Sequence, residues 1–166
     1  MAKLEIERTV QPSLIDRLTD EDTHTSLDPR TTYAESLRRF KFSVQRDLEW
    51  LLNTRQIAET PPEELEELHK SLYMFGVPDI TSMSRDSMPA RRRLLRYVEE
   101  ALMQFEPRLT NLRVSLVETD AEDRRRELRF VVEATLRLDP TPEQVMFDTV
   151  LQFTSGQYAL EGADHA

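Results

Sequence analysis

The stretch Phe105-Glu106-Pro107-Arg108-Leu109 places two opposite charges at a forced break between a helix and a strand. Proline cannot continue a helix, and it pushes the residue before it towards an extended conformation. Glu106 then lies near the negative end of the helix dipole, where a carboxylate is disfavoured by up to about 1 kcal/mol. Arg108, two residues on in extended chain, projects to the same side as Glu106. Two interpretations follow: a local ion pair that closes the helix, or a docking element for a partner.

Three segments before this break have apolar residues at helical spacing. The segment from Pro89 to Phe105 has Ser87 as its expected N-cap. The other two run from about Pro29 to Arg55, and from Pro61 to a terminating Gly76. The expected apolar stripes contain Leu94, Leu95, Val98, Ala101, Leu102 and Phe105 in the last segment, Tyr33, Leu37, Phe40, Val44, Leu48 and Leu51 in the first, and Leu65, Leu68, Leu72 and Phe75 in the middle one.

Two features outside these stripes have open interpretations. Trp50 falls off the first stripe, and we expect it at the edge of the core, the alternative being a surface anchor. Residues 1–28 are polar except for the cluster of Leu14, Ile15 and Leu18, which is either a short helix held by its own domain or a partner, or disordered. The run from Thr19 to Ser26 lacks periodicity and is typical of a linker. We therefore expect a flexible segment over residues 1–28 and one domain over residues 29–162.

The chain changes to period two after the break. Alternating residues predict strands over about 109–118, 128–138, 145–153 and 157–161, with breaks at a charged turn over 119–126, at Asp139-Pro140-Thr141-Pro142 and at Ser155-Gly156. Helices followed by a run of strands predict an α+β fold, with N-terminal helices packed on a C-terminal antiparallel meander sheet.

The last predicted hairpin, from about Val145 to Leu160, ends the meander. One of its strands must lie at an open edge, which either accepts a strand from another chain or is covered by its own chain. The expected core-facing residues are Phe147, Leu151 and Phe153, and the expected outward-facing, partner-binding residues are Asp148, Val150 and Gln152.

Composition limits the classes of function. The 166 residues are 39% hydrophobic and 32% charged, and the formal net charge of −9 disfavours non-specific binding to nucleic acid or to an anionic membrane. The chain has no cysteine, which leaves no disulfide, thiol nucleophile or cysteine metal site. No run has the length of a signal peptide or of a membrane span. We expect a cytoplasmic protein without metal or cofactor.

Five short segments then occur in an order that belongs to a known family. They are Ser13–Leu18, Ser43–Arg55, Phe75–Ile80, Phe105–Leu109 and Phe147–Thr149. A Glu-Pro-Arg string alone arises by chance, but five segments in order over most of a chain do not. The chain resembles the TssE family, the small baseplate wedge proteins of bacterial type VI secretion systems. These are relatives of the contractile-phage wedge proteins often labelled "lysozyme-related".

The resemblance implies a structural role in a baseplate. Its implied partners are the wedge proteins TssF, TssG and TssK, the TssB/TssC sheath, and the nearby VgrG hub and Hcp tube. Glu106, Pro107 and Arg108 match the family's docking element towards other wedge subunits, and the C-terminal strands resemble a sheath-subunit edge. A baseplate protein of a phage-tail-like particle is an alternative.

A lysozyme-like peptidoglycan hydrolase is a further alternative, which the residues disfavour. Glycoside hydrolysis needs two carboxyl groups roughly 5 to 9.5 Å apart, one of them protonated. Most carboxylates of this chain are expected on solvated surfaces, and Arg108 would keep Glu106 ionised. We expect no second carboxylate placed to work with Glu106 in catalysis, and no enzymatic activity. We also expect truncation of Glu106 or Arg108 to cost about 1 kcal/mol of stability or less if the pair is exposed.

Overall fold

The computed structural model describes residues 9–19, 32–79, 87–120, 123–139 and 141–161. The chain forms two compact units, residues 1–46 and 47–166, and their boundary falls inside helix α2 (Tyr33–Asn53). Nearly all of the expected linker, and the expected helix start at Pro29, lie outside the described residues. None of the helices within the described ranges is long and apolar enough to cross a membrane.

The first unit contains the short helix α1 (Leu14–Leu18) and most of α2. The Ser13 hydroxyl caps α1 by accepting a hydrogen bond from the Asp16 N–H at 3.2 Å, and the Asp16 carboxylate binds Arg46 of α2 at 2.8 Å. Burial alone would raise the pKa of Asp16, but the bonds from Ser13 and Arg46 outweigh it and lower that pKa. The segment is thus a helix bound within its own unit. Its apolar side chains, those of Leu14, Ile15 and Leu18, are all exposed.

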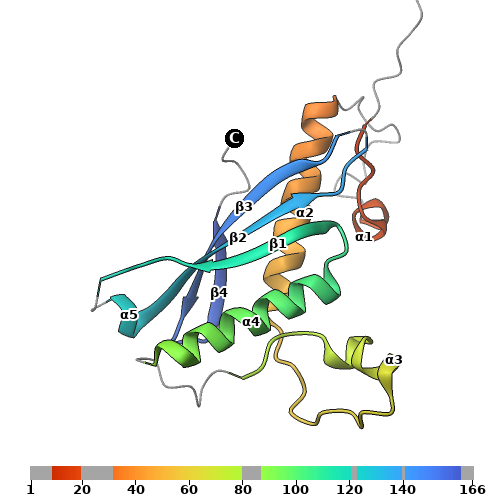
Figure 1. Cartoon of the computed structure of the whole chain (residues 1–166). Coiled ribbons are helices and arrows are strands. Elements are labelled where there is room, and N and C mark those ends of the chain that lie inside the picture. Colours follow the sequence, from red (N-terminus) through yellow and green to blue (C-terminus); the bar gives the residue numbers. More distant parts are fainter. Residues whose placement is uncertain (1–8, 20–31, 80–86, 121–122, 140, 162–166) are drawn as a thin grey trace, which may run out of the picture. The chain divides into compact units, whose positions relative to one another are not determined.

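The second unit is built on a four-stranded antiparallel meander in the order β1-β2-β3-β4 (Figure 1). The strands are β1 (Leu109–Leu116), β2 (Glu127–Leu136), β3 (Glu143–Gln152) and β4 (Gln157–Glu161). Alternate residues are buried along β2, β3 and β4, as expected for a sheet with one face on the core, whereas β1 buries only Leu109 and Leu112. The predicted α+β arrangement is confirmed. The charged turn expected before β2 contains a short helix instead, α5 (Asp123–Arg126).

Helix α4 (Met88–Phe105) precedes the sheet and contacts β1. The Ser87 hydroxyl accepts from the Ala90 N–H at 3.4 Å, which confirms the predicted N-cap, and the helix ends before Glu106 as predicted. Its stripe is buried except at Phe105, which is partly exposed. The core residues of this unit are Leu48, Leu51, Leu52, Val77, Leu94, Leu95, Val98, Ala101, Leu102, Leu109, Leu112, Leu128, Phe130, Val132, Ala134, Leu136, Val145, Phe147, Leu151, Tyr158 and Leu160.

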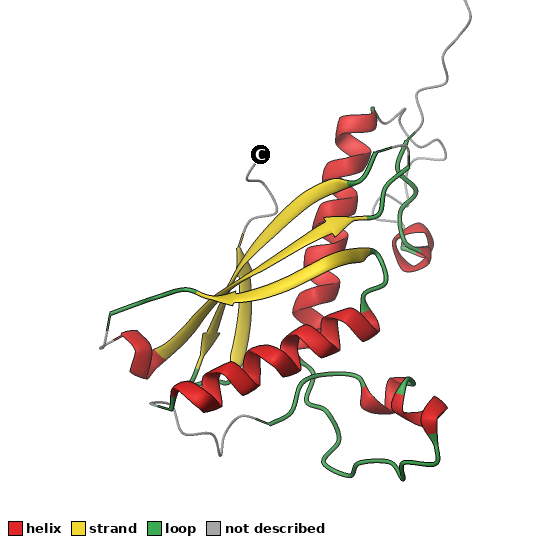
Figure 2. Cartoon of the chain, in the orientation of Figure 1, coloured by secondary structure: helices red, strands yellow, loops and turns green. Residues whose placement is uncertain are grey.

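The helix predicted between Pro61 and Gly76 is wrong. A loop there carries only two short pieces, α3 (Glu66–His69) and the 3₁₀ turn η1 (Leu72–Met74), as Figure 2 shows. The apolar residues have helical spacing, but Leu65 and Leu72 remain 50% and 79% exposed. A continuous helix here would therefore gain little stability from burial of its apolar face. The Ser71 hydroxyl accepts from the Tyr73 N–H at 3.2 Å and starts a new turn in place of a longer helix.

The base of this loop is closed by backbone pairing. The Val77 N–H donates to the Thr54 carbonyl, and the Gln56 N–H donates to the Val77 carbonyl, each at 2.9 Å. Gly76 sits at φ 111°, and a Cβ there would lie 2.4 Å from the Thr54 oxygen. The loop between Gln56 and Gly76 therefore leaves and returns at one point, at the end of α2.

Trp50 lies on the surface, contrary to the expectation of a core-edge position. It is 55% exposed, whereas Leu48, Leu51 and Leu52 beside it are buried. The inward face of this part of α2 is already filled by those leucines, which leaves the indole on the outer side.

Candidate functional site

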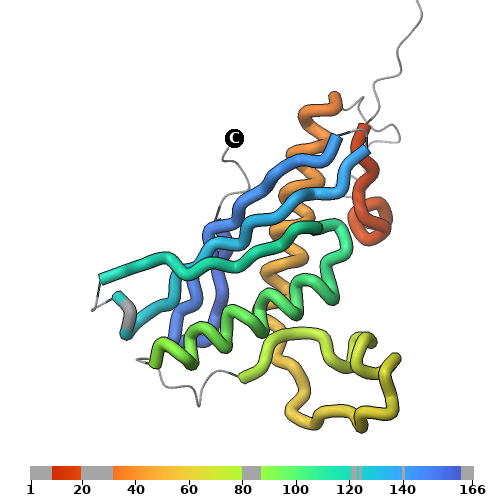
Figure 3. The backbone as a smooth tube through the Cα atoms, viewed as in Figure 1, coloured from red at the N-terminus to blue at the C-terminus, as the bar shows by residue number. Residues whose placement is uncertain are grey.

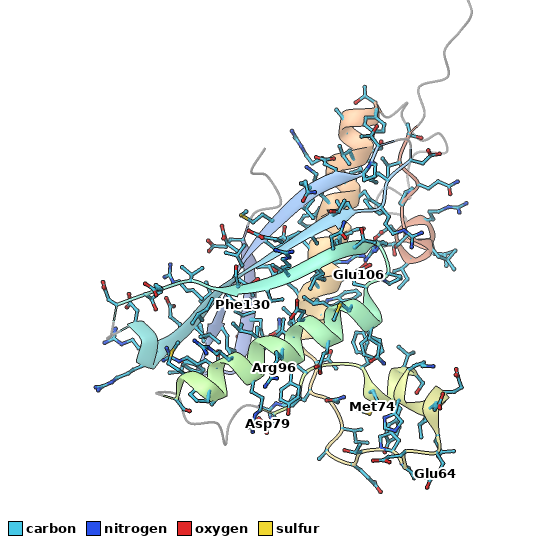
Figure 4. All side chains as sticks on the ribbon, in the orientation of Figure 1. Glu64, Met74, Asp79, Arg96, Glu106 and Phe130 are labelled. Carbon is cyan, nitrogen blue, oxygen red and sulfur yellow. The ribbon has the colours of Figure 1, made fainter. Side chains whose placement is uncertain are left out.

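The break after α4 is a tight corner held by backbone bonds. The Glu106 N–H donates to the Leu102 carbonyl at 2.9 Å and closes the helix, while the Leu109 N–H donates to the Glu106 carbonyl at 3.1 Å. The Arg108 carbonyl accepts from the Arg137 N–H at 2.9 Å, which joins the corner to the end of β2. Figure 4 shows Glu106 at this corner between α4 and β1. The chain enters the sheet directly behind Pro107.

An ion cluster fills the inside of the corner. Arg108 Nε donates to Glu106 Oε1 at 2.6 Å, and Arg108 Nη2 donates to Glu106 Oε2 at 2.5 Å. Arg108 Nη2 also donates to Asp47 Oδ2, on α2, at 2.7 Å. We call these three residues the Arg108 cluster. It connects α2, the end of α4 and the start of β1, so the guanidinium ties together three elements of the second unit.

The electrostatics of the cluster favour the charged guanidinium. Burial on its own would lower the pKa of Arg108, but the hydrogen bonds and charges of Glu106 and Asp47 outweigh burial and raise that pKa. The bidentate contact matches the planar fork of arginine, a geometry that lysine cannot reproduce.

The burial of Glu106 shows that the condition of an exposed pair, on which the expected small stability loss depended, is not met. The side chain of Glu106 is 6% exposed, against 22% for Arg108 and 25% for Asp47. The predicted ion pair is present, but it is an internal support rather than a solvated contact. A limit of about 1 kcal/mol applies to exposed pairs and not to this one. Pro107, by contrast, is exposed at the tip of the corner.

Two contacts join the α2–α4 loop to the same end of α4. Gln104 Nε2 donates to the His69 carbonyl at 2.6 Å, and the rings of Phe75 and Phe105 meet edge to face with centroids 5.2 Å apart. The loop therefore lies beside the residues that lead into the corner. Next to them, Met103 is 58% exposed.

Asp47 is the member of the cluster that sequence reasoning missed. It lies within the segment Ser43–Arg55, but it is one of several charged residues on α2 and is 61 positions from Arg108. Its placement brings a second carboxylate to the guanidinium that binds Glu106. The two carboxylates bind the same nitrogen of Arg108.

The other predicted partner-binding residues lie away from the edge of the sheet. Asp148, Val150 and Gln152 are on β3, which is paired with β2 on one side and with β4 on the other. They do point away from the core, with Gln152 exposed and the other two partly exposed. The edge strand of the last hairpin is β4, as expected, but α2 side chains bind its outer backbone groups. No contact in the described structure joins these three residues to the Arg108 cluster.

A cleft of the second unit lies apart from the Arg108 cluster, none of whose residues line it. The cleft, of about 400 Å³, lies between the end of α2, residues 77–79 and the β3–β4 turn, and is lined by both polar and apolar residues. Within the described ranges, no three histidine, aspartate or glutamate side chains are placed to hold a metal ion. We argue the function from the Arg108 cluster, which is suited to fixing the conformation of the surface at the corner between α4 and β1.

The comparisons with known proteins agree with this picture. The family model described as baseplate wedge protein gp25 matches residues 38–141, more than half of the chain. The matched region includes most of α2, all of α4 and the Arg108 cluster, and extends through β1 and β2 to the end of the β2–β3 connection. A search of curated proteins finds no match. The TssE-like resemblance is confirmed, and the chain belongs to the family of baseplate wedge protein gp25.

Proposed function

We propose that this baseplate protein serves a type VI secretion system, in which it joins wedge subunits and initiates assembly of the contractile sheath. The observation that carries the proposal is the family match over residues 38–141, together with the intact Glu106-Pro107-Arg108 junction inside it. Its proposed partners are TssF, TssG and TssK in the wedge, the TssB/TssC sheath, and the VgrG hub and Hcp tube nearby. The proposed location is the cytoplasmic face of the inner membrane.

The corner after α4 is the proposed contact with the other wedge subunits. The Arg108 cluster fixes the path of the chain from α4 into β1, and Pro107 is exposed at the tip. A surface held by buried charge pairs loses little conformational entropy when a partner binds it, which favours affinity. In this proposal Pro107 and the partly exposed face of Arg108 contact the partner, while Glu106 and Asp47 hold Arg108 in position.

The proposal predicts that the purified protein forms a stable complex with TssF and TssG. Co-expression followed by affinity purification and size-exclusion chromatography tests it, with TssB/TssC added afterwards to score sheath formation. Absence of the complex at micromolar concentrations would contradict the secretion-system role. A protein that instead assembles only with tail proteins encoded beside its own gene would belong to a phage-tail-like particle.

Hydrolase activity is not part of the proposed function. A general acid must give up a proton, yet both Glu106 oxygens accept hydrogen bonds from Arg108, and the side chain is 6% exposed. Asp47 is bound to the same guanidinium, so neither carboxylate is free to reach a sugar.

We expect no release of muropeptides from peptidoglycan by the purified protein. The measurement is chromatography of the soluble products, with a lysozyme as positive control and a Glu106→Gln, Asp47→Asn double variant as the matched background. Product above that background would show that the carboxylates are catalytic.

A further inference from the structure

The outer edge of β4 is occupied by two side chains of α2. Asn53 Oδ1 accepts from the Tyr158 N–H and Asn53 Nδ2 donates to the Tyr158 carbonyl, each at 2.9 Å. Glu49 Oε1 accepts from the Leu160 N–H at 3.3 Å. A carboxamide that binds the N–H and the carbonyl of one residue takes the place of a neighbouring strand. β4 thus offers a new strand fewer free groups than an edge normally does.

The opposite edge, on β1, is different. The Val117 N–H donates to the Arg129 carbonyl at 3.0 Å. Because hydrogen bonding alternates along an antiparallel strand, the backbone N–H and carbonyl groups of Ser115 and Arg113 also face β2. The N–H and carbonyl groups of Val114 and Leu116 therefore point away from β2, towards the open edge of the sheet. Among the described residues, no hydrogen bond to these outward groups is found.

Only the second half of β1 has this open character. A register shift between Thr110 and Arg113 marks a bulge, with Asn111 at φ 51°, and such bulges make an edge unsuitable for pairing. Beyond the bulge the strand is regular, and the side chains of Val114 and Leu116 are only partly buried. Figure 3 shows β1 and α4 diverging from their junction. An added strand would pair here and cover both side chains.

We propose, on the basis of the suggested role in sheath initiation, that β1 rather than β4 is the edge that accepts a strand. The occupant is an extended segment of a partner chain, with apolar side chains at alternate positions that cover Val114 and Leu116. Asn53 and Glu49 direct the partner to this edge because they close the other one. The recognition is mainly by backbone hydrogen bonds, which gives affinity without demanding a strict sequence.

Amide hydrogen exchange of the free protein tests the difference between the edges without any partner. We expect the Tyr158 and Leu160 amides to exchange at least about tenfold more slowly than those of Val114 and Leu116. In Asn53→Ala the protection of Tyr158 should fall, while Val114 should be unchanged. Equal protection at the two edges of the wild-type protein would overturn the proposal.

Proline scanning tests the partner. Val114→Pro removes an outward N–H and leaves the bonds to β2 intact, as proline does on natural edge strands, and Val114→Thr is the matched control that keeps the N–H. On reconstituted baseplates with TssB/TssC, we expect Val114→Pro to lower sheath nucleation by about tenfold or more, with Val114→Thr and Asn53→Ala near wild type.

Several outcomes would overturn this choice of edge. Normal nucleation on Val114→Pro baseplates would exclude β1. Faster nucleation with Asn53→Ala would show that β4 is the accepting edge, because that variant opens it. Wild-type baseplates that never nucleate a sheath would instead refute the proposed function, and the amide exchange of the free protein would still report on the edges.

Discussion

Replacing Arg108 with alanine is expected to lower the free energy of unfolding of the isolated protein by about 2 to 3 kcal/mol. The reason is that Glu106, 6% exposed, would be left buried without its bidentate partner. Partial exposure of Arg108 itself keeps the loss at or just below the low end of the range for buried pairs. Glu106→Ala should cost less, since Arg108 keeps Asp47 and reaches water. Urea denaturation followed by circular dichroism measures both.

The same variants separate support from docking. A domain of ordinary stability, about 5 to 15 kcal/mol, stays folded after such a loss, so binding to TssF and TssG can be scored on folded protein. Pro107→Ser should change stability by less than about 1 kcal/mol, because Pro107 is exposed, yet weaken the complex. Unchanged stability of Arg108→Ala would contradict the buried cluster. Full complex formation by folded Arg108→Ala and Pro107→Ser would exclude docking at this corner.

The corner itself could be predicted because its determinants are local. Pro107 ends α4 by removing a donor and clashing with the preceding turn, and Ser87 starts the helix with a side-chain acceptor. The strands were predicted from period-two alternation bounded by turn residues. The observed ends of β2 and β3 differ from the predicted ends by at most two residues. These signals act over a few residues, so they can be recognised in a single sequence.

The features that could not be predicted from the sequence depend on contacts between residues far apart in the chain. Asp47 meets Arg108 across 61 positions, and Asn53 meets Tyr158 across 105. No local pattern marks either residue among the polar side chains of α2. The opposite failure occurs between Pro61 and Gly76, where helical spacing is present but Leu72 stays 79% exposed, because spacing does not create the surface on which a helix packs. Likewise, the protection of the β4 edge by Asn53 and Glu49 could not be predicted without knowing that α2 runs beside β4.

Gly76→Ala is expected to destabilise the second unit by about 3 kcal/mol. Its φ of 111° is unfavourable for a side chain, and the new Cβ would lie 2.4 Å from the Thr54 carbonyl oxygen. Relief requires breaking the pairing of Val77 with Thr54 and Gln56, which closes the loop at the end of α2.

The matched control for this variant is Gly156→Ala, which isolates the steric clash from the backbone strain. Gly156 also has a positive φ, 69°, but a Cβ there meets nothing within 4 Å. Its substitution should cost only about 1 kcal/mol, the strain of a left-handed residue. Thermal and urea denaturation of both variants give the comparison, and the amide exchange of Val77 reports whether the loop base opens. Equal losses for the two variants would show that the contact with Thr54 does not restrain the loop. A larger loss for Gly76→Ala, with faster exchange at Val77, would establish that contact as the restraint that keeps the base of the loop closed at the end of α2.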